Sequence, residues 1–143
     1  MHSIIKNAAF GASFKFMNIP DDLMYSEDHQ WVRMEDDGLI RVGITDYAQD
    51  ALGEVVFVDL PEIDLLVEKG GALGEVESSK SVSEISAPLP GRVSEVNDDL
   101  ESNPGKINDD PYGEGWLCLI SGDQPDPISE LLDPDSYRSL LEG

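Results

Sequence analysis

One lysine stands in a context unlike that of the others. Lys80 is the centre of the segment Val76-Glu-Ser-Ser-Lys-Ser-Val-Ser-Glu-Ile85, with apolar residues on both sides and small polar residues in the middle. Such a pattern predicts a hairpin whose ends are pinned in a core and whose tip presents the lysine. Ser79 and Ser81 leave its ammonium group uncluttered. Spacing alone nevertheless favours an ordinary solvated loop lysine, because most lysines are solvated.

Other residue types offer little chemistry. Cys118 is the single cysteine, so the chain has no internal disulfide, cysteine zinc site or CxxC pair. His2 and His29 are the only histidines, which excludes histidine clusters. The phosphate-loop, dinucleotide, EF-hand and G-x-S-x-G patterns all fail. Thirty acidic residues provide many carboxylate pairs, and a small hydrolase stays an alternative, although such residues usually form a solvated face.

Length and charge narrow the class further. The chain has 143 residues and a formal net charge of −21, which suits one acidic domain. Nucleic acid is a poor partner, because phosphate binding requires basic surface, and anionic membranes are disfavoured for the same reason. The apolar runs fall far short of the roughly 20 residues of a membrane helix. We therefore expect no nucleic-acid and no membrane partner.

The first residues differ from the rest. Residues 1–17 carry two lysines and no acid, and they lack the apolar region and cleavage site of a secretory signal. We expect a leader or extension over 1–17, with Met17 a plausible start, and a single domain over 18–143. The alternative is an organelle transit peptide. The expected compartment is the bacterial cytoplasm, or the mitochondrial matrix if the leader is a transit peptide.

The pattern after Tyr25 is mostly β. Residues 31–34 and 39–44 flank an Asp-Asp-Gly turn typical of a hairpin. Thr45 or Asp46 can cap a helix that ends before Gly53. Further strands are expected at 55–58, which reads as buried, and at 76–77, 82–85, 93–96 and 116–120. Two Asp-Pro pairs, at 126–127 and 133–134, predict two short C-terminal packing helices.

A short internal repeat indicates the architecture. Gly53-Glu-Val-x-x-Val58 recurs as Gly91-Arg-Val-x-x-Val96, and a second apolar strand follows each copy, at 74–76 and at 115–117. Two half-sized β units in one domain predict a two-fold sandwich in which each half covers the apolar face of the other.

Several blocks together resemble a known family. The segment around Lys80, with the following Ala87-Pro88 and Gly91-x-Val93, is similar to the lipoyl-attachment region of the H protein of the glycine cleavage system. Matching blocks also include Tyr25-x-x-x-His-x-Trp-Val32, Val42–Gln49, Leu52–Val58, Leu60–Glu62 and Asn108–Leu117, so the resemblance spans residues 23–142. The serines beside Lys80 argue against biotin, whose acceptors typically place Met on both sides of the lysine.

The resemblance implies a fold and a function. The fold is a mainly β barrel-sandwich hybrid of two small sheets related by a quasi-two-fold axis, with short flanking helices including a C-terminal helical segment. The resemblance implies that lipoic acid is attached to Lys80 through an amide, and we expect the chain to be a monomeric, non-catalytic carrier. Its arm receives an aminomethyl group from a pyridoxal-phosphate glycine decarboxylase and passes the carbon to tetrahydrofolate on an aminomethyltransferase. A dihydrolipoyl dehydrogenase with FAD reoxidises the arm, and a lipoate ligase or a lipoyl/octanoyl transferase installs it.

The family also implies a cleft that shelters the loaded arm, and one position departs from its pattern. Gln30 stands where the family usually has Glu. We hypothesise that Asp28 replaces the lost carboxylate, because positions 28 and 30 share a face in an extended segment; the alternative is neutral drift at Gln30. Glu84 retains its acid, Glu77 is a further cleft candidate, and His29 is expected to orient the cleft wall.

Other functions fit the same fold. An H-like lipoyl carrier could serve lipoate relay or sulfur metabolism, and an unmodified interaction module could leave Lys80 free. Cys118, in an apolar strand, is expected to be a small buried hydrophobe rather than a redox thiol.

Overall fold

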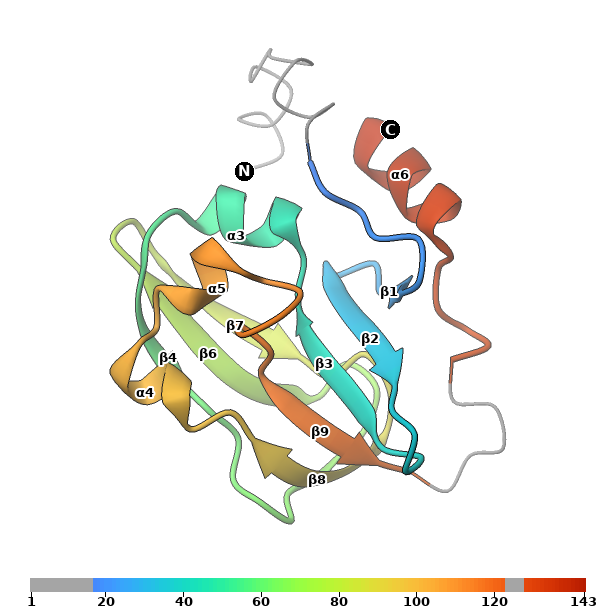
Figure 1. Cartoon of the computed structure of the whole chain (residues 1–143), viewed down its shortest axis with the longest axis horizontal. Helices are drawn as coiled ribbons and strands as arrows, with labels where there is room; N and C mark the ends of the chain where they lie inside the picture. The colour runs from blue at the N-terminus through green and yellow to red at the C-terminus, as the bar shows by residue number, and fades with distance from the viewer. Residues whose placement is uncertain (1–16, 123–127) are drawn as a thin grey trace.

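The computed structural model describes residues 17–122 and 128–143, so nearly all of the expected leader lies outside the described residues. The chain forms two antiparallel sheets with short helices at their edges (Figure 1). The strands are β1 (Met24–Tyr25), β2 (Gln30–Met34), β3 (Ile40–Ile44), β4 (Val55–Asp59), β5 (Leu66–Val67), β6 (Ala72–Ser78), β7 (Val82–Ser86), β8 (Gly91–Val96) and β9 (Cys118–Ser121). The helices are α3 (Asp46–Leu52), α4 (Asp99–Ser102), α5 (Lys106–Asp109) and α6 (Pro134–Glu142).

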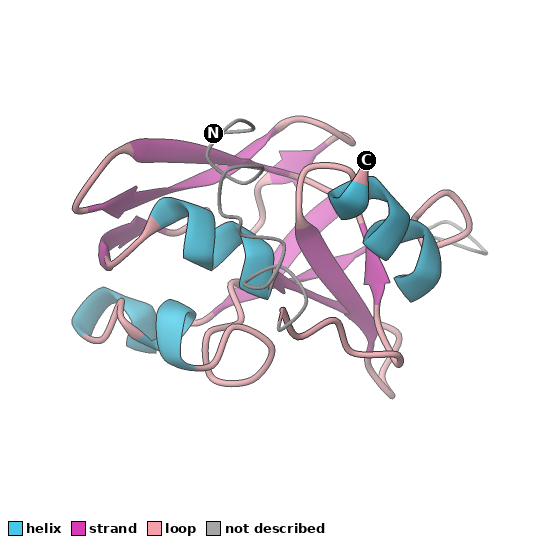
Figure 2. Cartoon of the chain, turned by 90° about the horizontal axis from the view of Figure 1, so that it is seen from above, coloured by secondary structure: helices cyan, strands magenta, loops and turns pink. Residues whose placement is uncertain are grey.

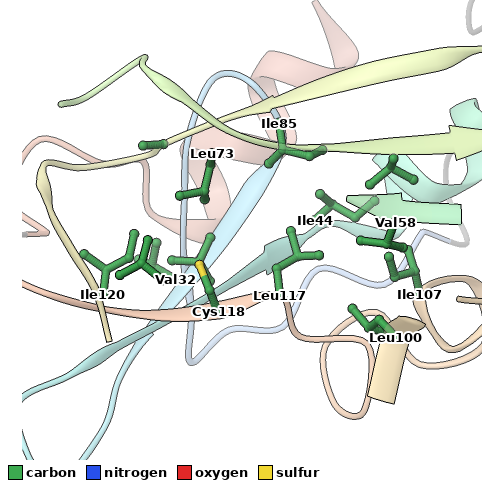
Figure 3. Close-up of a cluster of buried hydrophobic side chains, with 14 of the residues drawn as sticks. Val32, Ile44, Val58, Leu73, Ile85, Leu100, Ile107, Leu117, Cys118 and Ile120 are labelled. Atoms are coloured by element: carbon green, nitrogen blue, oxygen red, sulfur yellow. The ribbon is translucent and has the colours of Figure 1, made fainter. Parts of the chain in front are cut away.

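The core lies between the two sheets. The larger sheet has the order β1-β2-β3-β9-β8-β5, and the smaller has the order β4-β6-β7. Their inner faces meet in one cluster of buried aliphatic side chains, in which Val32 and Ile120 come from the larger sheet and Val76 from the smaller. Cys118 is fully buried in this cluster (Figure 3). The expected mainly β sandwich is therefore confirmed, and Cys118 packs as a hydrophobe.

The internal repeat corresponds to structure. Gly53–Val58 leads into β4 of the small sheet and Gly91–Val96 forms β8 of the large sheet. Each copy has a bulge at the same place, between Val55 and Phe57 in one and between Val93 and Glu95 in the other. Because a bulge bends its strand, the two copies are expected to bend at the same position of the repeat. The predicted second motifs are one residue out of register, since Val58 pairs with Val76 but Val96 pairs with Cys118.

The local sequence signals predict some of the helices correctly and one of them wrongly. The Thr45 hydroxyl accepts from the Ala48 N–H and caps α3, which ends at Leu52, directly before Gly53, as expected. Asp133 caps α6 in the same way. Of the other predicted C-terminal helix, residues 126–127 lie outside the described part, and Ile128–Glu130 form a turn. That prediction is wrong for 128–132, because Leu132 instead exchanges backbone hydrogen bonds with Tyr25.

Burial on β4 also differs from expectation. Val55 and Val58 are buried, but Val56 and Phe57 are about half exposed. The bulge turns these two residues outward, so β4 has one core face rather than two.

Seen from above, α6 lies apart from the other helices (Figure 2). None of the helices in residues 17–122 and 128–143 has the length and hydropathy to cross a membrane.

Candidate functional site

Lys80 lies at the tip of the β6–β7 hairpin, as the sequence predicts. Strand β6 ends at Ser78, β7 begins at Val82, and the Lys80 side chain is exposed. The Ser78 hydroxyl oxygen accepts from the N–H groups of Lys80 and Ser81, each at 3.1 Å, and the Ser78 N–H donates to the Ser81 carbonyl at 2.8 Å. Small serines thus form a tight turn that holds the lysine backbone while its side chain stays accessible.

The hairpin tip is fastened to the segment that follows α3. The Ser79 N–H donates to the Glu54 carbonyl at 2.9 Å. Asn108 of α5 holds the same segment from the other side, because its amide donates to the Gly53 carbonyl (2.9 Å) and accepts from the Val55 N–H (2.8 Å). The position of Lys80 therefore depends on contacts outside its own hairpin.

A cleft of about 410 Å³ lies between α3 and the free edge of the small sheet. It is lined by residues 27–30, by Ile44, by four residues of α3 (Tyr47, Ala48, Ala51 and Leu52) and by residues 83–86 of β7. Four of the predicted cleft residues are brought together here, namely Asp28, His29, Gln30 and Glu84. The walls combine aliphatic side chains of α3 with the carboxyl-bearing residues Glu27, Asp28 and Glu84.

Glu77 does not join them. It pairs with Phe57 on one side and Val82 on the other, both exposed, and it is absent from the cleft lining. The buried side chain of neighbouring Val76 points to the core, so Glu77 points to the outer face of the small sheet. The prediction that Glu77 lines the cleft is therefore wrong in this structure.

Asp28 and Gln30 meet at one hydroxyl group. Ser86 Oγ donates to Asp28 Oδ2 at 3.0 Å and accepts from Gln30 Nε2 at 3.2 Å. The two side chains do approach the same place, but the expected reason is wrong. Residues 27–29 form a turn, and His29 has a φ of 69°, so the segment is not extended.

Gln30 is more constrained than a drifting surface residue. The residue is 2% exposed, and the Ser26 hydroxyl donates to its Oε1. A neutral amide suits this place, because it can both accept from Ser26 and donate to Ser86. A buried carboxylate would lose the donor and carry an unpaired charge. Gln30 thus holds the cleft wall together through its hydrogen bonds to Ser26 and Ser86. Asp28, which is exposed, supplies the negative charge at this place.

His29 joins the cleft wall to the C-terminal helix. Its Nδ1 lies 2.9 Å from the Tyr137 hydroxyl, and that hydroxyl lies 2.8 Å from Thr45 Oγ1. The ring also packs against Tyr47 at 4.5 Å between centroids. Burial lowers the pKa of His29 below its usual 6.5, and the nearby Asp28 carboxylate opposes this shift only in part. An uncharged ring that is held by Tyr137 and by Tyr47 fits a residue that orients the cleft wall.

Cys118 is remote from this chemistry. Burial raises the pKa of its thiol to about 12, so almost no thiolate exists at neutral pH. The site therefore offers an accessible amine and a neighbouring acidic, partly apolar cleft. Such a pair suits an attached, mobile group with an apolar stem and a cationic end.

Comparison with known proteins decides the family. The model of the glycine cleavage H-protein family matches residues 23–143. The chain belongs to the glycine cleavage H-protein family. The match covers both sheets, the Lys80 hairpin and the cleft.

Individual family members agree. The chain is 54% identical to a glycine cleavage system H protein of Mycolicibacterium gilvum, over 84% of this chain and 94% of the relative. It is 52% identical to one of Mycobacterium tuberculosis strain H37Rv, over 87% and 97%. A crystal structure of a glycine cleavage system H protein from Mycobacterium marinum superposes with a TM-score of 0.76 at 44% identity, covering 85% of this chain and 97% of that one.

Sequence reasoning missed the supporting polar residues of the site. Ser86 and Ser26 act through tertiary hydrogen bonds, which no local pattern announces. Asn108 lies inside a matching block but 28 residues after Lys80, and its contact with Gly53 depends on how α5 packs against α3. The glycine in the Leu52–Val58 block was the one available signal for a close contact at this point.

Proposed function

We propose that the chain is the lipoyl-bearing shuttle of the glycine cleavage system, with lipoic acid attached to Lys80 Nζ through an amide. The observation that carries the proposal is the placement of an exposed lysine at a rigid hairpin tip beside an acidic cleft. The chain itself performs no bond chemistry. It carries the aminomethyl group of glycine from a decarboxylase to an aminomethyltransferase, and then presents the reduced arm to a dihydrolipoyl dehydrogenase.

The residues present fit a lipoyl group. Acylation removes the charge of Lys80 and leaves a long aliphatic stem, which needs an apolar surface when it is not extended into solvent. Ala48, Ala51 and Leu52 provide such a surface along one cleft wall. When bound, the lipoyl disulfide supplies the two-electron acceptor and the sulfur that holds the one-carbon fragment.

The cleft carboxylates have a role toward the cargo. An aminomethyl group carries a cationic amine, and water that reaches it promotes its loss. Asp28 is placed to pair with that amine, because Ser86 orients its carboxylate and Gln30 fixes Ser86. Glu84 provides a second acid in the cleft lining, on the edge strand β7 that also carries Ser86. Charge pairing in a partly shielded cleft is stronger than in open water.

The remaining system components follow from the same role. We assign the decarboxylase with pyridoxal phosphate, the transferase with tetrahydrofolate and the dehydrogenase with FAD as partners that hold the reactive cofactors. A lipoate ligase or a lipoyl/octanoyl transferase modifies Lys80. Tethering the substrate to a mobile arm raises its effective concentration at each active site.

Reconstitution tests the pathway. The lipoylated chain is incubated with glycine and a glycine decarboxylase, and intact mass is recorded with and without the decarboxylase. We expect addition of one aminomethyl group to the lipoylated chain and none to the unmodified chain. A lipoylated, folded chain that H-protein-dependent decarboxylases never load would contradict the proposal and point to another lipoyl-dependent pathway.

A further inference from the structure

We propose that Gly53 is a positioning residue for the arm: its missing side chain leaves the passage by which the Lys80 stem crosses from the hairpin tip to the cleft. This inference rests on the proposed attachment of a lipoyl group to Lys80. It concerns the route of the arm rather than its identity.

The contact between Gly53 and Lys80 is direct. A Cβ atom placed on Gly53 would lie 2.6 Å from Lys80 Cε, 3.4 Å from Nζ and 3.8 Å from Cδ. A separation of 2.6 Å is well inside van der Waals contact, so any side chain at position 53 would occupy the space of the lysine stem. The stem therefore lies across the Gly53 backbone.

The backbone at Gly53 is held in place by other contacts. Its φ of 85° and ψ of −160° belong to a region that is essentially restricted to glycine. Its N–H donates to the Gln49 carbonyl, and its own carbonyl accepts from Asn108. The Asn108 amide also donates to the Gln49 side chain at 2.9 Å. Residue 53 is thus a fixed surface beneath a flexible side chain.

Gly53 also lies on the way to the cleft. It directly follows Leu52, the last residue of α3, and Leu52 lines the cleft together with Ala48 and Ala51. Figure 1 shows the β6–β7 tip beside the end of α3. The hydrogen bond from the Ser79 N–H to the Glu54 carbonyl holds the tip and the passage together. An arm that starts at Lys80 and follows α3 must cross residue 53 first.

A methyl group at position 53 would strain the backbone, because the φ of 85° disfavours any side chain, and it would also displace the arm. The atoms that it would meet are the far end of a lysine side chain, which can rotate away, rather than backbone. The cost of moving them is a change in the direction in which the arm leaves the tip. The lysine stays exposed and can still be acylated.

The test compares Gly53→Ala with Gly38→Ala. Both glycines have a φ of 85°, but a Cβ at Gly38 would have nothing within 4 Å, and Gly38 lies in the distant β2–β3 turn. The control thus places a side chain at a φ of 85° without the lysine contact. Each chain is lipoylated, loaded with an aminomethyl group and placed in buffer without enzymes.

Two readouts report whether the arm is sheltered. The first is spontaneous loss of the cargo, in which water releases formaldehyde and ammonium and restores the thiol, followed by intact mass. The second is alkylation of the free arm thiol by a maleimide. Cys118 does not interfere, because it is fully buried and its thiol pKa is raised to about 12. Population-shift reasoning predicts that both rates rise roughly three- to tenfold in Gly53→Ala and stay at the wild-type value in Gly38→Ala.

The outcomes separate this inference from the function beneath it. Equal rates of cargo loss and thiol alkylation in Gly53→Ala, Gly38→Ala and the wild type would overturn the role of Gly53 and leave lipoylation intact. Failure of the wild type to accept lipoate would instead overturn the proposed function. If Gly53→Ala does not fold, Asn108→Asp provides the second variant. It keeps the acceptor for the Val55 N–H and loses the donor to the Gly53 carbonyl, so the same rates should rise. Unchanged rates in that folded variant would contradict the proposal.

Discussion

His29 and Tyr137 are 108 residues apart in the chain, and His29 Nδ1 lies 2.9 Å from the Tyr137 hydroxyl. The contact joins the cleft wall to the C-terminal helix α6. The same hydroxyl lies 2.8 Å from Thr45 Oγ1, the residue that caps α3. One phenol group therefore connects three elements around the cleft.

Removal of this hydroxyl should weaken the fold. Tyr137→Phe keeps the aromatic ring, which stacks on Tyr25 at 4.6 Å between centroids, and removes only the bridge. We expect a loss of about 1–3 kcal/mol in the free energy of unfolding, because buried partners lose their hydrogen bonds. Urea unfolding measures this directly. Unchanged stability would show that the bridge contributes nothing.

His29 should make stability depend on pH. Burial lowers its pKa in the folded state below the unfolded value of 6.5, so the unfolded state binds more protons between the two values. Its contribution to the free energy of unfolding is therefore complete above about pH 7 and falls as the pH drops through 6.5.

The matched variant is His29→Asn, since asparagine tolerates the positive φ at this position. We expect the stability difference between the wild type and His29→Asn to change as the pH is lowered from 7.5 to about 5, with the wild type losing stability faster. Parallel pH profiles of unfolding, measured in urea, would show that His29 does not titrate in this window. Carboxylates common to both proteins cancel in the comparison.

Asp28 should help to retain the cargo. Asp28→Asn removes the carboxylate that Ser86 orients, and leaves the amide of Gln30 as its neighbour. We expect loss of the aminomethyl group in buffer to accelerate several-fold, because the cationic amine loses its partner. Asp36→Asn, an exposed acid in the β2–β3 turn, gives the same net charge as a control. Release no faster than in the wild type would mean that Asp28 does not replace the carboxylate missing at position 30.

The acidic surface should steer the carrier to its partners. With a net charge of −21, attraction to basic surfaces around active-site entrances would speed encounter at low ionic strength. We expect kcat/KM for reoxidation of the arm by dihydrolipoyl dehydrogenase to fall steadily from low to high salt. Reduction of the arm by dithiothreitol, whose attacking thiolate has the same sign of charge as the carrier, should not fall with salt. A salt-independent enzymatic rate would leave solubility as the use of the charge.

Local signals account for the parts of the fold that depend on neighbouring residues. The Asp36-Asp37-Gly38 turn, the Thr45 cap and the serine-rich tip around Lys80 are determined within a few residues, and each was predictable from the sequence. The repeat at Gly53 and Gly91 was predictable too, because both copies carry the same glycine and valine spacing. Its second half was predictable only to within one residue.

The cleft depended on tertiary contacts that sequence reasoning could not see. Gln30 is buried because Ser26 and Ser86 satisfy its amide, and the turn at His29 brings Asp28 to the same hydroxyl by a route that an extended strand would not follow. Glu77 was expected in the cleft because it is close to Lys80 in sequence, but it lies on the central strand β6, whereas the cleft is bordered by the edge strand β7. The turn at Ile128 follows from the pairing of Leu132 with Tyr25, a long-range contact.

Attachment of the arm is the central claim, and intact mass tests it most directly. The chain is incubated with lipoate, ATP and a lipoate ligase, in parallel with Lys80→Arg and with Lys69→Arg and Lys106→Arg as matched lysine controls. We predict one added lipoyl amide on the wild type and on both controls, and none on Lys80→Arg. Absence of any addition to correctly folded wild type, or addition that persists in Lys80→Arg, would contradict the account.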